Sequence, residues 1–281
     1  MTIKIMLDAG HYINYNPSTI YPKYKEGTMT WRLQKYLKKE LEEYGFIVGT
    51  TRTDGYVDTE VYSRGIRAKG YDVFLSLHSS TCGDKNVDKI TVIKGHDQPD
   101  GISVNLAKEL TKTMEVDQEY EIITKTTKNG NEYYGVLRGA KSAGVKDRYI
   151  VEYGFHTNSN TARWLCEIEN IKKIASTTAK VLANHYGYKK KTILTRDSSS
   201  NNIKWSKPKV TWRDGDYGLK ARTLANVNLR KGRGTNYDVI QVIPKGTIFN
   251  LEYVNNNWGS TWDFNDEVGY LCCEYIEIFL K

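Results

Sequence analysis

The stretch VFLSLH at residues 73–78 decides the fold of the first two thirds of this chain. It is a short apolar run that ends in a histidine, and such a run is typical of a buried strand. Similar strand-like runs at residues 3–7 and 46–50 are separated from it by amphipathic helical runs at residues 28–44 and 60–69. Strands that alternate with helices predict an α/β domain with a mostly parallel, twisted sheet and helices on both faces.

The same alternation continues along the chain. We expect a strand at residues 90–93, a helix at 101–114, a strand at 149–155 and further helical sequence up to about residue 186. In the first helix, apolar residues recur at every fourth position from Met29 to Leu41 while charges take the other face, so this helix should pack on the sheet. Ligands of such sheets gather beyond the carboxyl ends of the strands.

The length and the local composition predict two domains. At 281 residues the chain exceeds the usual size of one domain, and we assign residues 1–188 to the α/β domain. Residues 189–209 lose periodicity and are rich in Lys and Arg, which predicts a flexible basic linker. Residues 210–281 hold short β-type runs broken by Gly and Asn, a pattern that predicts a small all-β barrel.

The formal net charge of +8 suits an acidic partner: nucleic acid, an anionic membrane surface or the anionic polymers of a bacterial wall. Nucleic acid is disfavoured, because the basic residues are dispersed and the sequence has no zinc-finger spacing, RNP-like segment or basic helix-turn-helix. No stretch approaches membrane-spanning length, so stable membrane insertion is not expected. The N-terminus runs straight into a strand without a signal peptide, which predicts synthesis in the cytoplasm.

Four polar residues stand at the ends of these elements. His11 ends the first strand, Glu26 precedes the first long helix, and His78 ends the strand at residues 73–78. Two imidazoles, one carboxylate and an open fourth position are the usual protein share of a catalytic zinc site. Glu152 lies in the strand at 149–155, where a charge is costly to bury unless it is paired or functional. A nearby Glu that is not a ligand can activate zinc-bound water, so the sequence predicts a zinc hydrolase.

These residues belong to four motifs that occur in a fixed order. The motifs are DAGH at residues 8–11, Glu26 ahead of a long helix, SLH at 76–78 and VEYGFHTN at 151–158. Together they resemble the zinc-dependent N-acetylmuramoyl-L-alanine amidases, and the resemblance covers roughly residues 1–188.

The resemblance implies a role for each residue. His11, Glu26 and His78 would bind Zn²⁺, and Glu152 would be the catalytic carboxylate that takes a proton from water and delivers it to the leaving amine. The chain departs from the family after the first histidine, where a Gly-Gly pair often follows. Here residues 12–17 read YINYNP, which leaves the shape of this loop open but removes none of the implied ligands.

Other residues near the motifs have mainly structural interpretations. Asp8 is expected to orient an imidazole or the first turn rather than to bind metal. Arg52 and Arg64 are expected in structural ion pairs rather than in contact with substrate. His156 is placed where it can touch substrate, and Asn158 is expected to cap the segment that follows it.

Purely structural roles would also account for the implied ligands. A loop or core histidine bonded to a carbonyl would account for His11 or His78 taken singly, and the helix dipole would account for Glu26. The metal interpretation depends on their occurrence together. The four cysteines are expected to be reduced, and Cys82 is not needed as a ligand because the set already has three.

The C-terminal region carries a second resemblance. It resembles bacterial SH3-type modules through VNLRKG at 227–232, YDVI at 237–240, PKGT at 244–247 and GYL at 269–271. Such modules in wall hydrolases commonly bind peptidoglycan. The resemblance implies a wall-binding role for this region.

These observations lead to a functional prediction. We expect a peptidoglycan hydrolase that cleaves the amide between N-acetylmuramic acid and L-alanine of the stem peptide, with peptidoglycan also bound by the C-terminal module. A phage or prophage endolysin released through a holin lesion is the simplest account, and an autolysin is the second. A zinc peptidase or deacetylase acting on peptidoglycan, or a non-catalytic wall-binding protein, remains an alternative. The host species and the oligomeric state stay open.

Overall fold

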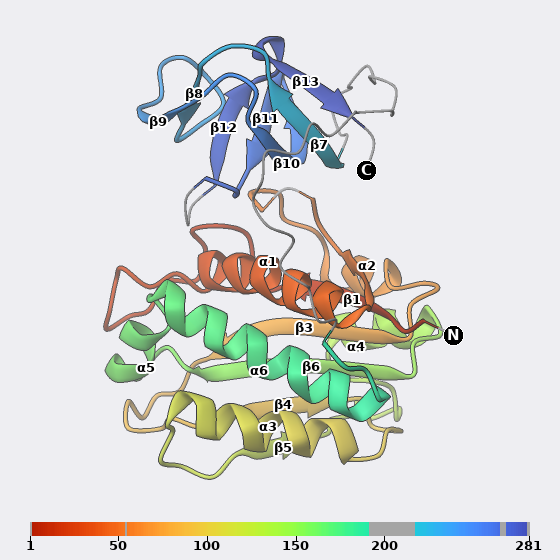
Figure 1. Cartoon of the computed structure of the whole chain (residues 1–281). Coiled ribbons are helices and arrows are strands. Elements are labelled where there is room, and N and C mark those ends of the chain that lie inside the picture. The colour runs from red at the N-terminus through yellow and green to blue at the C-terminus, as the bar shows by residue number, and fades with distance from the viewer. Residues whose placement is uncertain (1, 54, 191–216, 265–267, 280–281) are drawn as a thin grey trace. The chain divides into compact units, whose positions relative to one another are not determined.

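The structure is a computed structural model that describes residues 2–53, 55–190, 217–264 and 268–279. The chain divides into two compact units, Met1–Leu194 and Thr195–Lys281, which are shown in Figure 1. The basic linker predicted at 189–209 lies outside the described residues from position 191 onward.

The first unit is built on a six-stranded sheet. Its strands are β1 (Lys4–Ala9), β2 (Ile47–Thr50), β3 (Val73–Ser80), β4 (Thr91–Lys94), β5 (Glu121–Ile123) and β6 (Asp147–Phe155). They lie in the order β2-β1-β3-β6-β4-β5, and every pairing is parallel except that of β4 with β6. The sheet is therefore mixed, which refines the mostly parallel prediction. Residues 81–90 between β3 and β4 hold no helix, so β4 does not make the crossover that a parallel strand requires.

Helices cover both faces of this sheet, as predicted (Figure 1). They are α1 (Glu26–Tyr44), α2 (Val61–Ile66), α3 (Gly101–Met114), α4 (Gly135–Ser142), α5 (Ser159–Trp164) and α6 (Ile168–Tyr186). Helices α1, α3 and α6 pack on one face, and α2 and α4 pack on the other. The sequence pattern predicted neither β5 nor α4, which are short, and it placed the start of α1 two residues too late.

Side-chain alternation along β3 divides the core between the two faces. Val73, Leu75 and Leu77 are fully buried with the apolar residues of α1, α3 and α6. Phe74 points the other way and packs with apolar residues of α4. Because side chains alternate along a strand, His78 follows Phe74 onto the face covered by α2 and α4, at the carboxyl end of the strand. This face is where the candidate site lies.

The second unit is an antiparallel sheet of seven strands. They are β7 (Tyr217–Thr223), β8 (Val227–Arg230), β9 (Val239–Ile243), β10 (Ile248–Asn255), β11 (Trp258–Thr261), β12 (Gly269–Cys272) and β13 (Ile276–Phe279). Their order is β13-β7-β10-β11-β12-β8-β9, around one apolar core that includes Leu229, Leu251 and Leu271. The β-rich prediction for this region agrees with the sheet, while the SH3-type barrel stays a prediction.

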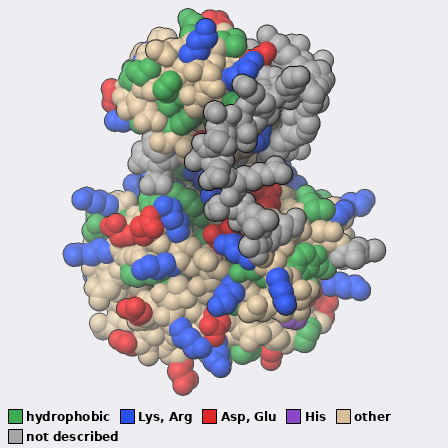
Figure 2. All heavy atoms as spheres, viewed as in Figure 1, with side chains coloured by type: hydrophobic (Ala, Val, Ile, Leu, Met, Phe, Trp, Pro, Cys, Tyr) green, Lys and Arg blue, Asp and Glu red, His purple; other side chains and the backbone are tan. Residues whose placement is uncertain are grey.

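The distribution of surface charge fits the expectation from composition. On the face seen in Figure 2, Lys and Arg side chains of the first unit lie interspersed with acidic ones rather than in one basic patch. Within the described ranges, no helix has both the length and the apolar character needed to cross a membrane. Among the described residues, no cysteine forms a disulfide.

Candidate metal centre

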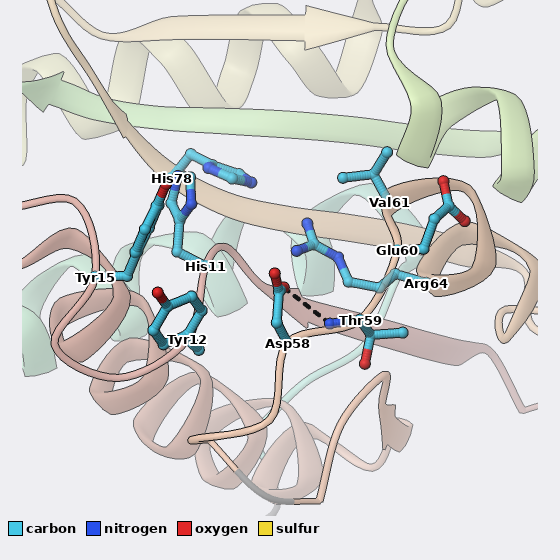
Figure 3. Close-up of a pocket in the computed structure, with 9 residues that line it drawn as sticks. All are labelled: His11, Tyr12, Tyr15, Asp58, Thr59, Glu60, Val61, Arg64 and His78. Carbon is cyan, nitrogen blue, oxygen red and sulfur yellow. Dashed lines mark hydrogen bonds between the residues drawn. The ribbon is translucent and has the colours of Figure 1, made fainter.

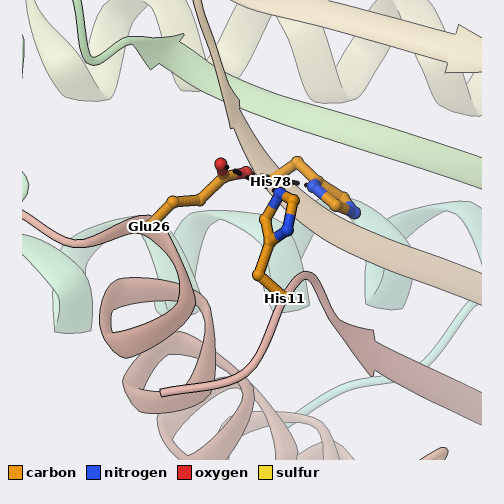
Figure 4. A group of neighbouring side chains, drawn as sticks. All are labelled: His11, Glu26 and His78. Carbon is orange, nitrogen blue, oxygen red and sulfur yellow. Dashed lines mark hydrogen bonds and ion pairs between the residues drawn. The ribbon is translucent and has the colours of Figure 1, made fainter. Parts of the chain in front are cut away.

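His11, Glu26 and His78 converge at the carboxyl edge of β1 and β3 (Figure 4). The Glu26 carboxylate lies between the two imidazoles. Its Oε2 is 3.2 Å from His11 Nε2, and its Oε1 is 3.0 Å from His78 Nδ1. One ligand atom from each residue lies within 4.8 Å of the others. Cys82 does not belong to this group of described residues.

The turn after β1 sets the position of His11. The Gly10 N–H donates to Leu77 O at 2.9 Å, which continues the pairing of β1 with β3, and Thr30 of α1 donates to Gly10 O at 2.6 Å. His11 itself has a φ of 57°, in the left-handed region that non-glycine residues rarely adopt. The Arg52 guanidinium donates to the His11 carbonyl and so holds this backbone conformation.

Two glycines allow the parts of the site to approach closely. A Cβ on Gly10 would lie 2.3 Å from Cε1 of His78, and a Cβ on Gly27 would lie 1.9 Å from the Tyr12 carbonyl oxygen. Neither contact is sterically possible. Only glycine at these two positions lets the His11 turn pack against both the β3 histidine and the first turn of α1.

Glu26 is the buried member of the group, with 1% of its side chain exposed. It lies in the first turn of α1, where the helix dipole favours a carboxylate. The Ser79 N–H donates to Oε1 at 2.9 Å, and the Asn16 side-chain amide donates to Oε2. The sequence motifs identified neither Asn16 nor Ser79. The left-handed φ of 53° at Asn16 is the kind of position that asparagine tolerates, but no pattern in the sequence linked it to Glu26.

The electrostatics of the group suit a cation. Burial opposes ionisation of Glu26, but hydrogen bonds from His11 and His78 hold the pKa of this carboxyl well below its usual range. Burial lowers the pKa of His78, and the hydrogen bond to Glu26 together with its charge outweighs this effect, so the net pKa of His78 is raised. A buried carboxylate that stays charged between two imidazoles is a donor set that fits zinc.

His156 is buried beside Tyr24 and Ser79, which gives no support to the expected contact with substrate. It is 1% exposed, its ring stacks on Tyr24 with centroids 5.3 Å apart, and its Nδ1 lies 2.8 Å from Ser79 Oγ. Burial lowers its pKa. His156 therefore supports the strand that carries the Ser79 N–H donor to Glu26.

Asp8 is the centre of a buried network beside the metal-ligand group. It is fully buried and accepts hydrogen bonds from Thr51 at 2.6 Å and from Ser76 at 2.7 Å, and it forms an ion pair with Arg64 at 3.0 Å. The structural ion pair expected for Arg64 is therefore present. Asp8 joins β1, β3 and α2, and its described partners do not include an imidazole.

Arg52 was expected in an ion pair, but its described partners are of another kind. Its described hydrogen-bond partners are carbonyl oxygens, those of Ala9 at 2.6 Å, Val57 at 3.0 Å and His11. Burial lowers the pKa of its guanidinium to about 10. Arg52 thus connects the His11 turn to the segment that begins at Val57. This segment forms one side of a cleft, and the two histidines lie on the other side.

Glu152 lies beside His78 on the neighbouring strand. In the parallel pairing of β3 with β6 these two residues are directly opposite each other, and adjacent strands in a sheet are about 4.8 Å apart. Burial raises the pKa of the Glu152 carboxyl to about 7. Its Oε2 is buried and has no hydrogen-bond partner among the described residues. An unpaired carboxyl with a raised pKa is suited to proton transfer near neutral pH.

A cleft of about 390 Å³ opens onto the two histidines (Figure 3). Its lining residues come from the His11 turn, from the segment before α2, from α2 itself and from the end of β3. They are His11, Tyr12, Tyr15, Asp58, Thr59, Glu60, Val61, Arg64 and His78. The sequence motifs identified the two histidines and Arg64 but none of the others, because the cleft joins segments whose spacing along the chain gives no signal.

A second group of potential ligands lies near the amino end of β6. His96, Asp97 and Glu132 also place one ligand atom each within 4.8 Å of the others. Two cations already occupy that group: Arg148 pairs with Glu132 at 2.6 Å and also with Asp97, and Lys141 pairs with Asp97 at 3.1 Å. Because these cations neutralise both carboxylates, the group at Glu26 is the better cation site.

The comparisons with known proteins identify the family of this chain. The protein family described as Amidase_3, N-acetylmuramoyl-L-alanine amidase, matches residues 5–184, so the chain belongs to this family. No curated protein matches the chain.

Solved structures of amidases share the fold of the first unit. One is the catalytic domain of CwlV, an N-acetylmuramoyl-L-alanine amidase from Bacillus (Paenibacillus) polymyxa var. colistinus, with a TM-score of 0.57 and 15% identity, which covers 67% of this chain and 100% of that one. Another is the amidase AmiC2 of Nostoc punctiforme, with a TM-score of 0.55 and 17% identity over 66% of this chain and 97% of that one. At these identities the likeness concerns the fold.

The close approach at Gly10 makes a prediction about metal binding. Replacement Gly10→Ala should lower zinc affinity at least tenfold, because the added Cβ displaces the His78 ring by more than a zinc–nitrogen bond tolerates. Competition with a chromophoric chelator measures this affinity. Gly101→Ala is the matched control, since a Cβ there meets nothing within 4 Å. Equal zinc affinity of Gly10→Ala and the wild type would contradict the geometry.

The raised pKa of Glu152 makes a prediction about stability. In metal-free protein the native state keeps a proton on Glu152 between the ordinary pKa of 4.5 and about 7, whereas the unfolded chain loses it, so the wild type loses stability as pH rises through this window. Glu152→Gln should therefore be more stable than the wild type at pH 8 by about 1–3 kcal/mol and equally stable at pH 4. Urea unfolding in the presence of a chelator, with the exposed Glu119→Gln as control, measures the difference. A gain that is the same at both pH values would refute the assignment.

Proposed function

We propose that this protein is a zinc-dependent peptidoglycan hydrolase that cleaves the amide between N-acetylmuramic acid and L-alanine of the stem peptide. The observation that carries the proposal is the convergence of His11, Glu26 and His78, with Glu152 on the adjacent strand. Membership of the N-acetylmuramoyl-L-alanine amidase family supports the choice of bond.

His11, Glu26 and His78 would hold the ion, with the cleft on its open side. The His11 side chain is 32% exposed and that of His78 is 17% exposed, while Glu26 is buried behind them. Zinc bound there supplies a Lewis acid that polarises the scissile carbonyl and lowers the pKa of a water molecule. Asn16 and Ser79 fix the Glu26 carboxylate by donating to its two oxygens.

Glu152 performs the proton transfers in this mechanism. Its ionised carboxylate accepts a proton from the attacking water, and the resulting acid donates that proton to the leaving amine of L-alanine. Burial places the pKa of this group near neutrality, so both protonation states are accessible at physiological pH. The Oε2 atom has no competing partner among the described residues, which leaves it available for this exchange.

Two other activities would use the same groups. A zinc peptidase or a deacetylase acting on peptidoglycan needs the same ion and the same general base, so the metal chemistry alone does not identify the scissile bond. The family match favours the amidase over both. A non-catalytic wall-binding protein would have no use for an unpaired carboxyl with a raised pKa beside the metal-ligand group.

The second unit would direct the enzyme to the wall. We propose that residues 210–281 form an SH3-type module that binds peptidoglycan, on the strength of its sequence motifs and of the antiparallel sheet. Tyr237, in one of these motifs, is 46% exposed and is a candidate ligand contact. Release of the enzyme through a holin lesion, as a phage or prophage endolysin, is the cellular role that we propose.

Mass analysis of digested wall tests the reaction. Purified protein should release stem peptides that begin with a free L-alanine amine and leave an intact lactyl carboxyl on the glycan. Glu152→Gln should lower kcat at least 100-fold at unchanged zinc content, and His78→Ala should lower both zinc content and activity. Release of acetate, or a new amine inside the stem peptide, would select the deacetylase or the peptidase instead. Unchanged lysis by both variants would reject the site.

Truncation tests the role of the second unit. A chain that ends at residue 194 should lose most of its binding in pull-down with purified walls but keep its kcat/KM on a soluble muropeptide, because the cleft is made entirely by the first unit. The full-length chain is the control. Full wall binding by the shortened chain would refute the targeting role.

A further inference from the structure

Arg64 lies in the cleft with most of its hydrogen-bonding capacity unused. The residue is 4% exposed, and among the described residues its guanidinium makes one hydrogen bond, from Nη2 to Asp8 Oδ2 at 3.0 Å. Its Nε is buried and has no partner in the described part of the chain. An arginine has five N–H donors in a rigid fork, so a buried arginine with a single bond is under-satisfied.

The unused part of this guanidinium faces the reaction site. Arg64 lines the same cleft as His11 and His78, and Figure 3 shows its guanidinium directed from α2 toward the two histidines. Asp8 fixes the side chain through this hydrogen bond, and Asp8 is in turn held by Thr51 and Ser76. The guanidinium is therefore pre-organised. A ligand that supplies acceptor oxygens would complete its hydrogen bonding without a change in the side-chain conformation.

The ligand chemistry follows from the shape and charge of the donor. A guanidinium fork matches a carboxylate with two parallel hydrogen bonds, whereas a neutral amide offers one acceptor oxygen. In the proposed substrate, the residue that follows L-alanine is acidic, and its α-carboxyl group is either free or amidated. An extended chain advances at most about 3.6 Å per residue, so this group lies within about 7 Å of the scissile nitrogen. A cleft lined by both His78 and Arg64 can therefore hold the scissile nitrogen and this carboxyl group together.

We infer that Arg64 is a substrate-binding residue that recognises the free α-carboxylate of the second stem-peptide residue. This inference rests on the proposed amidase function and adds a specificity to it: the enzyme should prefer muropeptides in which that carboxyl group is free over those in which it is amidated. Asp58 lines the same cleft with an exposed carboxylate and opposes the bound anion.

The test compares two muropeptides that differ only in this group. They are N-acetylmuramoyl tetrapeptides with a free or an amidated α-carboxyl on the second residue, and the readout is the ratio of their kcat/KM values with the full-length, zinc-loaded protein. The wild type should prefer the free carboxylate at least tenfold. Arg64→Lys keeps the charge that neutralises Asp8 but loses the fork, so the ratio should fall below threefold. Asp58→Asn should raise the ratio, and Arg163→Lys, an exposed arginine outside the cleft, should leave it unchanged.

A ratio within one variant is insensitive to a partial loss of folded protein. A wild-type ratio near one, or an equal loss on both substrates in Arg64→Lys, would overturn the Arg64 assignment while leaving the amidase function intact. If the wild type cleaves neither muropeptide, the proposed function fails instead. In that case the dissociation constants of the two muropeptides with Glu152→Gln decide the Arg64 assignment, because a tenfold preference for the free carboxylate supports it and equal binding overturns it.

Discussion

The buried charge of Glu26 is the constraint on which the rest of the site depends. A carboxylate that is 1% exposed must be paired and hydrogen-bonded, or it would take up a proton. Two imidazoles, a backbone N–H and a side-chain amide surround its two oxygens. These partners come from segments other than α1, so the charge of one residue fixes the relative positions of the β1 turn, the end of β3 and the loop before the helix.

The loop after His11 contributes to the stabilisation of this buried charge. The sequence has no Gly-Gly pair there, and Asn14 and Asn16 adopt φ angles of 70° and 53°. Asparagine is among the residues that tolerate left-handed backbone, so the turn keeps conformations that glycine would otherwise supply. Asn16 also donates its side-chain amide to Glu26, which glycine cannot do. The loop thus supplies one of the partners of the buried carboxylate.

The sequence indicated the strand-end residues of the site better than the loop residues around them. Strand ends are strong signals: His11 and His78 follow apolar runs, and the period of two that buries Leu75 and Leu77 on one face also determines the face on which His78 lies. Contacts between distant loops leave no such periodic signal. The cleft tyrosines and the support from Asn16 therefore emerged only from the structure. The place of β4 in the sheet also gave no such signal, because its antiparallel partner is β6, which follows more than 50 residues later in the chain.

The central claim is that one metal ion binds between the two imidazoles and the buried carboxylate. Anomalous diffraction at the zinc edge, from crystals grown with zinc, tests it most directly. We expect one strong peak at about 2.0–2.2 Å from a nitrogen of His11, a nitrogen of His78 and an oxygen of Glu26. A peak at His96, Asp97 and Glu132 instead, or an ion that leaves Glu26 unbound, would contradict the account.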